Sequence, residues 1–212
     1  TKIVEAVRNG SLDEKVLDET VRRILHFVAD WQNARRPDAV IDREEARVLS
    51  RELAAQCAVL LKNEENILPL RAEDTAAFIG EFARTPRYQG AGSSHINVSH
   101  VAGALDAAAG KKVTYARGYD AHSSKSDEAM LAEAVAAAKA AGTAVVFAGL
   151  PDSFETEGCD RETLALPDNQ NELIATVAAA NPNTVVVLHG GAPMELPWLD
   201  SVKAVLCVYL GG

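Results

Sequence analysis

A long polar loop holds the residue types best suited to proton transfer. Residues 151–166 form a connection of sixteen residues, well beyond the roughly 4–6 that usually join elements. Next to Gly158 it carries four charged residues: Glu155, Glu157, Asp160 and Arg161. Neighbouring like charges raise a carboxyl pKa while an arginine keeps another carboxyl ionised, so the loop is suited to supply one proton donor. The alternative is a solvated acidic surface loop, which the composition alone favours.

A second polar loop, residues 84–97, offers groups that can bind hydroxyls or phosphate. Its candidate binding residues are Arg87, Gln89, Gly90, Gly92, Ser93, Ser94 and His95. A phosphate cradle is disfavoured, because the Walker lysine is absent and no clean G-x-G-x-x-G opens a helix. A serine hydrolase using Ser93 or Ser94 with His95 is also disfavoured, since no strand-to-helix G-x-S-x-G elbow presents the serine.

The other histidines and the cysteines do not form a metal-binding pattern. The remaining histidines are His26, His100, His122 and His189, and the cysteines are Cys57, Cys159 and Cys207. All are widely separated and none has metal-type spacing, so we expect no metal site. An odd number of cysteines also argues against a disulfide framework. A reducing compartment fits best, and we expect a cytoplasmic protein.

Short apolar runs alternate with alanine-rich helical stretches after residue 58. The runs cover 59–61, 76–79, 113–115, 144–150, 184–188 and 205–210, and the clearest helices cover 127–141 and 168–180. This alternation predicts an α/β fold, a mostly parallel sheet with helices on both faces like the flavodoxin sandwich. Several runs lead into glycines that let the backbone approach a ligand. Because ligands bind at the carboxyl ends of parallel strands, we expect loops 84–97 and 151–166 to lie side by side.

Residues 1–57 differ from the rest and predict a helical arm before the sandwich domain of residues 58–212. Ser11 and Glu14 have capping-box spacing, and apolar residues then recur at helical intervals over about five turns. Residues 32–41 break the periodicity and are typical of a linker. Asp42 and Glu45 repeat the cap spacing before a second helix.

The charge balance excludes several classes of partner. Thirty acidic and 21 basic residues give a net charge of −9, which repels nucleic acid and anionic membrane surfaces. No apolar run approaches the roughly 18 residues of a membrane span. We therefore expect neither a nucleic-acid nor a membrane partner.

Four stretches of the chain, in order, resemble the bacterial β-glucosidase branch of family 3 glycoside hydrolases. They read AAQCAVLLKNEENILPL at 54–70, PRYQGAGSSHIN at 86–97, FETEGCDRETLALP at 154–167, and NPNTVVVLH at 181–189 followed by VYLGG at 208–212. The likeness extends over nearly the whole chain, and residues 3–28 resemble the helical segment that follows the barrel of that family.

The resemblance implies part of a retaining exo-acting β-glycosidase that hydrolyses terminal β-D-glucosyl residues of a glucoside or oligosaccharide without a cofactor. Glu157, which opens the E-G-x-D-R motif, takes the role of general acid/base, and Glu155 is the reserve candidate. Asp160 and Arg161 would fix the loop, while loop 84–97 would line the sugar pocket.

The same resemblance implies that a (β/α)8 barrel carrying an aspartate nucleophile belongs to the same protein and that the N-terminus of the chain is truncated. The chain would then be inactive alone. The alternative function is a non-catalytic, flavodoxin-like ligand-binding or interaction domain.

Overall fold

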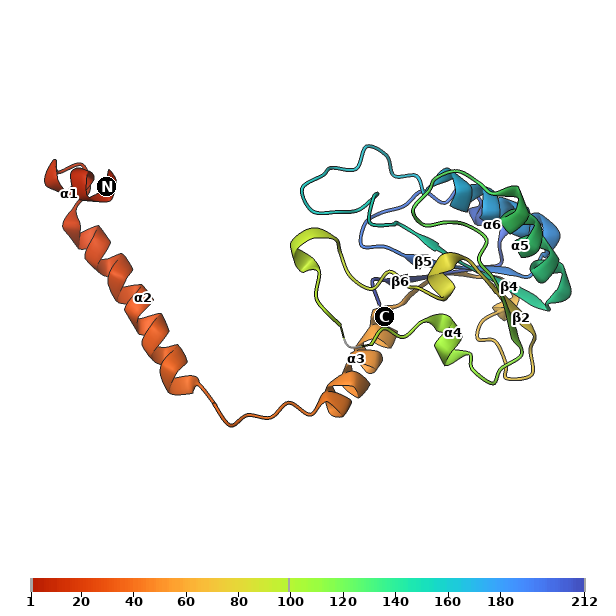
Figure 1. Cartoon of the computed structure of the whole chain (residues 1–212), viewed down its shortest axis with the longest axis horizontal. Helices are drawn as coiled ribbons and strands as arrows, with labels where there is room; N and C mark the ends of the chain where they lie inside the picture. The colour runs from red at the N-terminus through yellow and green to blue at the C-terminus, as the bar shows by residue number, and fades with distance from the viewer. Residues whose placement is uncertain (1, 99, 212) are drawn as a thin grey trace. The chain divides into compact units, whose positions relative to one another are not determined.

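The computed structural model describes residues 2–98 and 100–211 (Figure 1). The chain divides into two compact units, Thr1–Ala46 and Arg47–Gly212. Residues 1 and 212, at the ends of the expected arm and sandwich, lie outside the described residues, as does Ser99.

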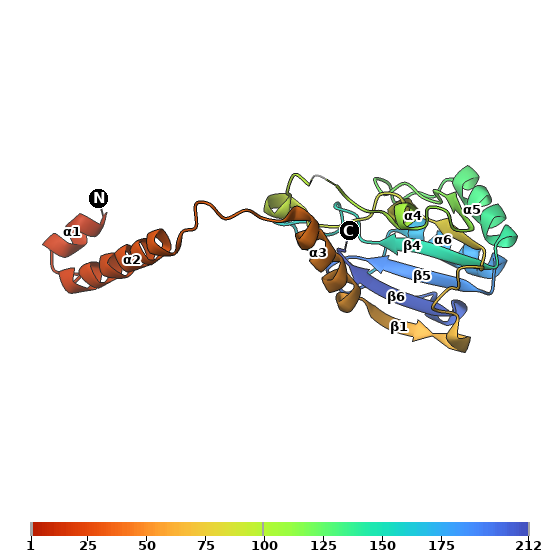
Figure 2. The same ribbon diagram turned by 90° about the horizontal axis from the view of Figure 1, so that it is seen from below.

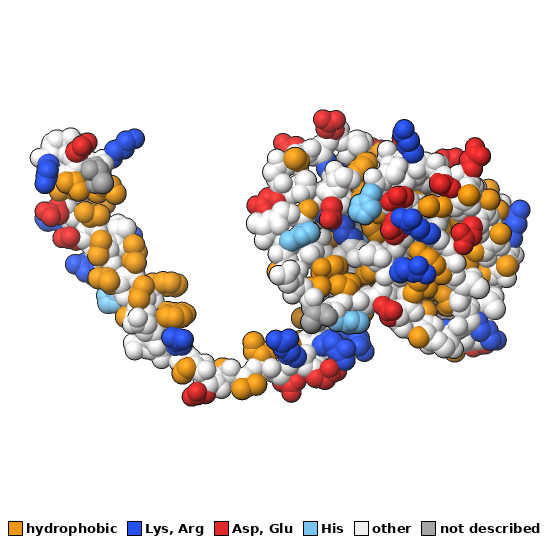
Figure 3. Space-filling model, viewed as in Figure 1, with side chains coloured by type: hydrophobic (Ala, Val, Ile, Leu, Met, Phe, Trp, Pro, Cys, Tyr) orange, Lys and Arg blue, Asp and Glu red, His pale blue; other side chains and the backbone are white. Residues whose placement is uncertain are grey.

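The first unit carries helices α1 (Lys2–Arg8) and α2 (Glu14–Ala34). The expected Ser11–Glu14 capping box is wrong, because the side chain of Asp13 caps α2 by accepting from the Lys15 amide at 2.9 Å. Ser11 instead donates its hydroxyl to the carbonyl of Ala6 at 3.2 Å. Neither helix has a buried residue. Apolar side chains at helical spacing, including Ile24, Phe27 and Trp31, stay exposed, and Figure 3 shows a row of hydrophobic atoms along α2.

Helix α3 (Arg43–Cys57) leads into the sheet. Its expected cap at Asp42 is confirmed: the carboxylate accepts from the amides of Glu44 at 2.9 Å and Glu45 at 3.1 Å. Strand β1 (Val59–Asn63) follows directly. Within the described part of the chain, no helix combines the length and apolar character needed to cross a bilayer.

The second unit contains a six-stranded sheet in the order β1-β6-β5-β4-β2-β3. The further strands are β2 (Ala76–Ile79), β3 (Val113–Ala116), β4 (Thr143–Gly149), β5 (Thr184–His189) and β6 (Ala204–Tyr209). Strands β2 to β6 run parallel to one another, and β1, at one edge of the sheet, pairs antiparallel with β6. Figure 2 shows β4, β5, β6 and β1 side by side. The predicted mostly parallel α/β sheet is therefore confirmed.

Helices cover the sheet unequally. Helices α5 (Glu128–Ala140) and α6 (Asp168–Ala180) pack against each other and against the central strands. Among the described residues between β2 and β3, helix α4 (Ala104–Ala107) follows two short 3-10 helices, Glu81–Ala83 and Gly92–Ser94. This connection steps from β2 to β3, whereas the later connections step the other way along the sheet, from β3 to β4, β5 and β6. Since such crossovers are right-handed, α4 lies on the other face, as Figure 1 shows. The chain thus leaves β2 and β4 toward opposite faces, and this topological switch point is where open α/β sheets bind ligands.

Buried valines and alanines from β4 and β5 fill the centre of the core, with Leu173 and Ile174 of α6 packed against them. Two of the strand-end glycines serve this packing instead of a ligand. A Cβ on Gly149 would overlap the carbonyl oxygen of His189, and one on Gly80 would overlap the carbonyl oxygen of Phe147. Gly80 and Gly149, which follow two of the predicted apolar runs, therefore make room for a neighbouring strand, and the expectation that they let a ligand approach is not needed to explain them.

Candidate functional site

Residues 151–166, which we call the acidic loop, follow the carboxyl end of β4 and include a narrow turn. Thr156 and Cys159 form an antiparallel bridge, which leaves Glu157 and Gly158 at the tip. Gly158 has φ +83°, a conformation that turns of this kind reserve largely for glycine. The turn places the Glu157 side chain at the exposed end of the loop.

Glu157 faces the loop that follows β2. Its Oε2 accepts from the Ser93 amide at 2.8 Å and from the Ser93 hydroxyl. Gly92 has φ +78°, and a Cβ there would lie 2.8 Å from the Cβ of Glu157, so the close approach requires glycine. Loops 84–97 and 151–166 therefore lie side by side, as predicted. The Ser93 hydroxyl, and then its amide, hold the pKa of Glu157 below its usual range.

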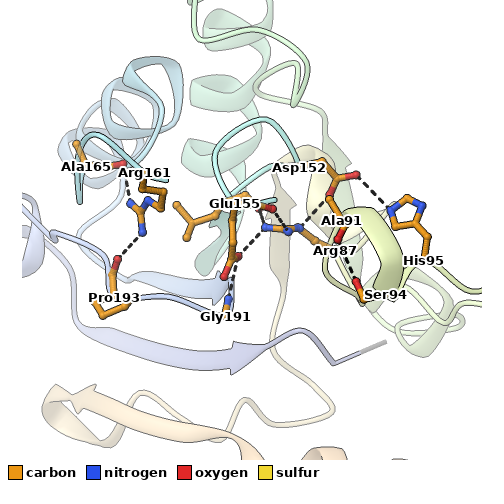
Figure 4. A network of polar contacts seen from close by, with 11 residues as sticks. Arg87, Ala91, Ser94, His95, Asp152, Glu155, Arg161, Ala165, Gly191 and Pro193 are labelled. Carbon is orange, nitrogen blue, oxygen red and sulfur yellow. Dashed lines mark hydrogen bonds and ion pairs between the residues drawn. The ribbon is translucent and has the colours of Figure 1, made fainter. Parts of the chain in front are cut away.

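Arg87 also connects the same two loops, through Glu155 and Asp152 (Figure 4). It is buried, with 6% of its surface exposed. One guanidinium nitrogen donates to the Leu150 carbonyl at 2.6 Å and to the Glu155 carboxylate at 2.7 Å. The other donates to the Glu155 carbonyl at 2.7 Å. Its Nε lies 3.0 Å from Asp152 Oδ1, an ion-pair contact without hydrogen-bond geometry.

Glu155 and Glu157 thus have different surroundings, although only one residue separates them. The Glu155 carboxylate pairs with Arg87 and also accepts from the Gly191 amide at 3.0 Å. The Glu157 carboxylate accepts from Ser93 at one oxygen and remains exposed. Of the two side chains, that of Glu157 is the more open to solvent or a ligand, since Glu155 is partly buried.

Other expected binding residues hold their own loop together. The Gln89 side chain accepts from the Ile96 amide at 3.1 Å, and the Ser94 hydroxyl donates to the Ala91 carbonyl at 3.2 Å. A Cβ on Gly90 would lie 2.9 Å from the Ser94 hydroxyl. His95 lies with its Nε2 3.9 Å from Asp152 Oδ2 (Figure 4). Among the expected binding residues, Ser93 is the one that donates hydrogen bonds to Glu157, while the side chains of Gln89 and Ser94 hold their own loop together.

Arg161 secures the far end of the acidic loop. It donates to the Pro193 carbonyl at 2.7 Å and to the Ala165 carbonyl at 3.4 Å. Asp160 is exposed. The arginine therefore ties this limb of the loop to the segment that follows β5.

A cavity of about 320 Å³ opens between the loops that follow β2, β3 and β4. Arg87, Gln89 and His95 line it, as do two residues that our sequence analysis did not single out as ligands, Asp152 and His122. Their only sequence signal is a position shortly after a strand, which is the binding edge of such a sheet.

His189 is a core residue at the end of β5. Burial lowers its pKa to about 4, so the ring is neutral at pH 7, and it lies 5.6 Å from the Phe82 ring. Among residues 2–98 and 100–211, no group of three or more His, Cys, Asp or Glu side chains is arranged to hold a metal ion.

Comparisons with known proteins extend these observations. A family model described as the glycosyl hydrolase family 3 C-terminal domain matches residues 58–212. Thermostable beta-glucosidase B of Acetivibrio thermocellus is 45% identical over 216 residues, which cover 100% of this chain and 29% of that protein. An exo-alpha-(1->6)-L-arabinopyranosidase of Bifidobacterium longum is 39% identical over 224 residues, covering 100% of this chain and 30% of that protein.

A solved structure shows the same likeness in three dimensions. The crystal structure of a GH3 beta-glucosidase from Bifidobacterium adolescentis aligns with a TM-score of 0.93 at 40% identity, covering 100% of this chain and 32% of that one. The present chain thus spans about a third of the length of these relatives.

Proposed function

The chain belongs to glycosyl hydrolase family 3, and from this premise we propose that it supplies the general acid/base of a retaining exo-β-glucosidase. Relatives of this chain carry the names beta-glucosidase and exo-arabinopyranosidase, and each is about three times as long. In our proposal the additional length includes a (β/α)8 barrel that brings the aspartate nucleophile and grips the terminal β-D-glucosyl residue.

The contrast between the two glutamates of the acidic loop carries the proposal. A general acid must reach the glycosidic oxygen and exchange a proton with it. Glu155 is tied on both carboxylate and carbonyl by Arg87, which suits a structural role. Glu157 is exposed at the tip of a turn and accepts from Ser93. We therefore assign the acid/base to Glu157 and keep Glu155 as the reserve candidate.

The proposed reaction is a double displacement. The nucleophile attacks the anomeric carbon while the protonated Glu157 carboxyl donates its proton to the leaving oxygen, and Glu157 then removes a proton from the water that cleaves the glycosyl-enzyme. Ser93 favours the ionised form of Glu157, which suits the second step. The first step requires Glu157 to be protonated. A nucleophile carboxylate about 5–5.5 Å away would favour this by raising the pKa of Glu157 through like-charge repulsion.

The test is Glu157→Ala in the full-length protein, the product of the gene that encodes this chain. Hydrolysis of a glucoside with a sugar leaving group should fall by about 10²–10⁴-fold, since it needs general acid help. Formation of the glycosyl-enzyme from dinitrophenyl β-glucoside should be nearly unchanged, because dinitrophenolate leaves without a proton.

Azide identifies which glutamate acts as the acid/base. With Glu157→Ala and the activated substrate, azide should restore turnover and give β-glucosyl azide, since a small anion attacks the intermediate without base help. Glu155→Ala should give no azide product, because Glu157 remains in place. An azide product from Glu155→Ala alone would move the acid/base to Glu155, and its absence from both would end the assignment to this loop.

A further inference from the structure

We propose that Arg87 is the positioning residue of the acid/base loop and that it acts on catalysis through Glu155, without touching the substrate. The inference rests on the proposed role of Glu157. Arg87 belongs to the loop after β2, whereas the segment that it contacts, residues 150–155, follows β4. The arginine therefore fixes the loop after β4 relative to the end of the neighbouring strand β2.

The Arg87 guanidinium binds two points near the beginning of the acidic loop, Leu150 and Glu155, and so holds them close together. Its hydrogen bonds reach the carbonyl of Leu150, directly after β4, and both the carbonyl and the carboxylate of Glu155 (Figure 4). The chain between these two anchors also makes a tight turn, in which the Phe154 amide donates to the Pro151 carbonyl at 2.9 Å. The backbone at Glu155 is consequently fixed relative to the sheet.

Glu155 is fixed from a third direction as well. Its carboxylate accepts from the Gly191 amide in the segment after β5, and a Cβ on Gly191 would lie 2.8 Å from its other oxygen. Thr156 follows immediately and pairs with Cys159 to close the turn that carries Glu157. Only Thr156, itself held by this pairing, separates Glu155 of the ion pair from the proposed acid/base Glu157.

Arginine is needed here for its shape. Three of the acceptors lie around one planar fork, and a lysine ammonium would keep the charge without matching that geometry. The ion pair is also screened from water, since Arg87 is buried and the Glu155 side chain is 22% exposed. Loss of the guanidinium would remove the donor of all three hydrogen bonds, so the acidic loop would no longer be held to the loop after β2 by Arg87.

The experiment uses Arg87→Met and Arg87→Lys in the full-length protein. A misplacement near 1 Å can cost about 10²-fold in rate, so Arg87→Met should lower kcat on a glucoside with a sugar leaving group by about 10–10²-fold and leave KM nearly unchanged. Glycosylation by dinitrophenyl β-glucoside should stay within about twofold, as it needs no proton. Arg87→Lys should recover part of the loss.

Two further variants separate positioning from general damage. Arg117→Met removes another arginine that pairs with carboxylates at the same sheet edge, Glu81 and Asp120, and should leave kcat unchanged. Arg87→Met combined with Glu157→Ala should be no slower than Glu157→Ala alone, because Arg87 acts only through Glu157. The proposal would be overturned if the double variant were slower than Glu157→Ala alone. It would also be overturned if Arg87→Met slowed the substrates with sugar and dinitrophenolate leaving groups equally.

Hydrogen exchange keeps the inference testable apart from catalysis. Arg87→Met should speed exchange of the Glu155 and Gly191 amides by more than tenfold while core amides of β4 keep their protection. Unchanged exchange at both amides would overturn the clamp even if Glu157 proves to be the acid. A third outcome is faster exchange in Arg87→Met together with no azide rescue in Glu157→Ala. The contacts of Arg87 would then be structural only, and both the proposed acid/base and the catalytic role of Arg87 would be refuted.

Discussion

Hydrogen bonds from Ser93 lower the pKa of Glu157. The serine hydroxyl and amide both donate to one carboxylate oxygen, and hydrogen bonds to the charged form lower a carboxyl pKa. The contact therefore contributes to stability only while Glu157 is ionised, above its unfolded pKa, and the contribution is lost as the pH falls through the lowered value. Glu157 is fully exposed, so this effect on folding is small, and its main consequence concerns catalysis.

Replacing Ser93 by alanine should raise the pKa of Glu157, because the hydroxyl donor is its largest cause of lowering and only the amide remains. General acid catalysis requires the protonated form, so the high-pH limb of kcat/KM for a sugar glucoside should move to higher pH. The pH–rate profile of the full-length protein measures this shift. Ser94→Ala, which removes a hydroxyl bound to the Ala91 carbonyl, should leave the limb where it is. A limb that does not move in Ser93→Ala would mean that Ser93 does not control the pKa of the general acid in the free full-length enzyme.

Loops after neighbouring strands, instead of helices or strands themselves, build the candidate site. The loop after β2 contributes Arg87 and Ser93, and the loop after β4 contributes Glu155 and Glu157. They meet because β2 and β4 are adjacent in the sheet although β3 lies between them in the sequence. Glycines at the contact let the two backbones approach closely.

Gly92→Ala should impair the proposed acid/base function specifically. Its added Cβ would lie 2.8 Å from the Cβ and 2.9 Å from Oε2 of Glu157, so the two loops must separate. We expect kcat on a sugar glucoside to fall by about tenfold or more in the full-length protein.

Gly110→Ala is the matched control, because Gly110 also has φ +78° but its Cβ would meet nothing within 4 Å. Both variants should lose about 1 kcal/mol of unfolding free energy from the strained backbone, measurable by urea denaturation. Equal kcat in the two variants would show that the Gly92 contact has no role in catalysis.

At the scale of the whole molecule, the two units differ in how much they bury. The second unit has a continuous core beneath α5 and α6, whereas α1 and α2 in the first contain no buried residue. Exposed apolar stripes such as that on α2 are typical of surfaces that contact another part of a protein or a partner. This observation fits our proposal that the chain works as part of a longer hydrolase.

The isolated chain should not hydrolyse dinitrophenyl β-glucoside above the buffer rate, because double displacement needs the carboxylate nucleophile that we assign to the barrel. A steady-state assay of the purified chain beside the full-length protein tests this expectation. Turnover by the chain that Glu157→Gln abolishes would place the whole catalytic machinery within these 212 residues.

Local sequence signals located the main strands and helices of the sheet domain, but not the short helix α4. The predicted runs 76–79 and 168–180 coincide with β2 and α6, because apolar periodicity and nearby proline or glycine are properties of short segments. The same signals predicted which sheet edge carries the polar loops. The Ser11–Glu14 cap failed because Asp13, a residue between them, caps the helix instead and accepts from the Lys15 amide.

The sequence by itself determined the α/β class, the order of the elements and the family, since these follow from local periodicity and from motifs such as E-G-x-D-R. The tertiary structure alone decided that Arg87 pairs with Glu155, that Ser93 binds Glu157, and that Gly149 makes room for a neighbouring strand. Each of these contacts joins residues at least 40 positions apart. They depend on strand order and side-chain direction, which are set only when the chain folds.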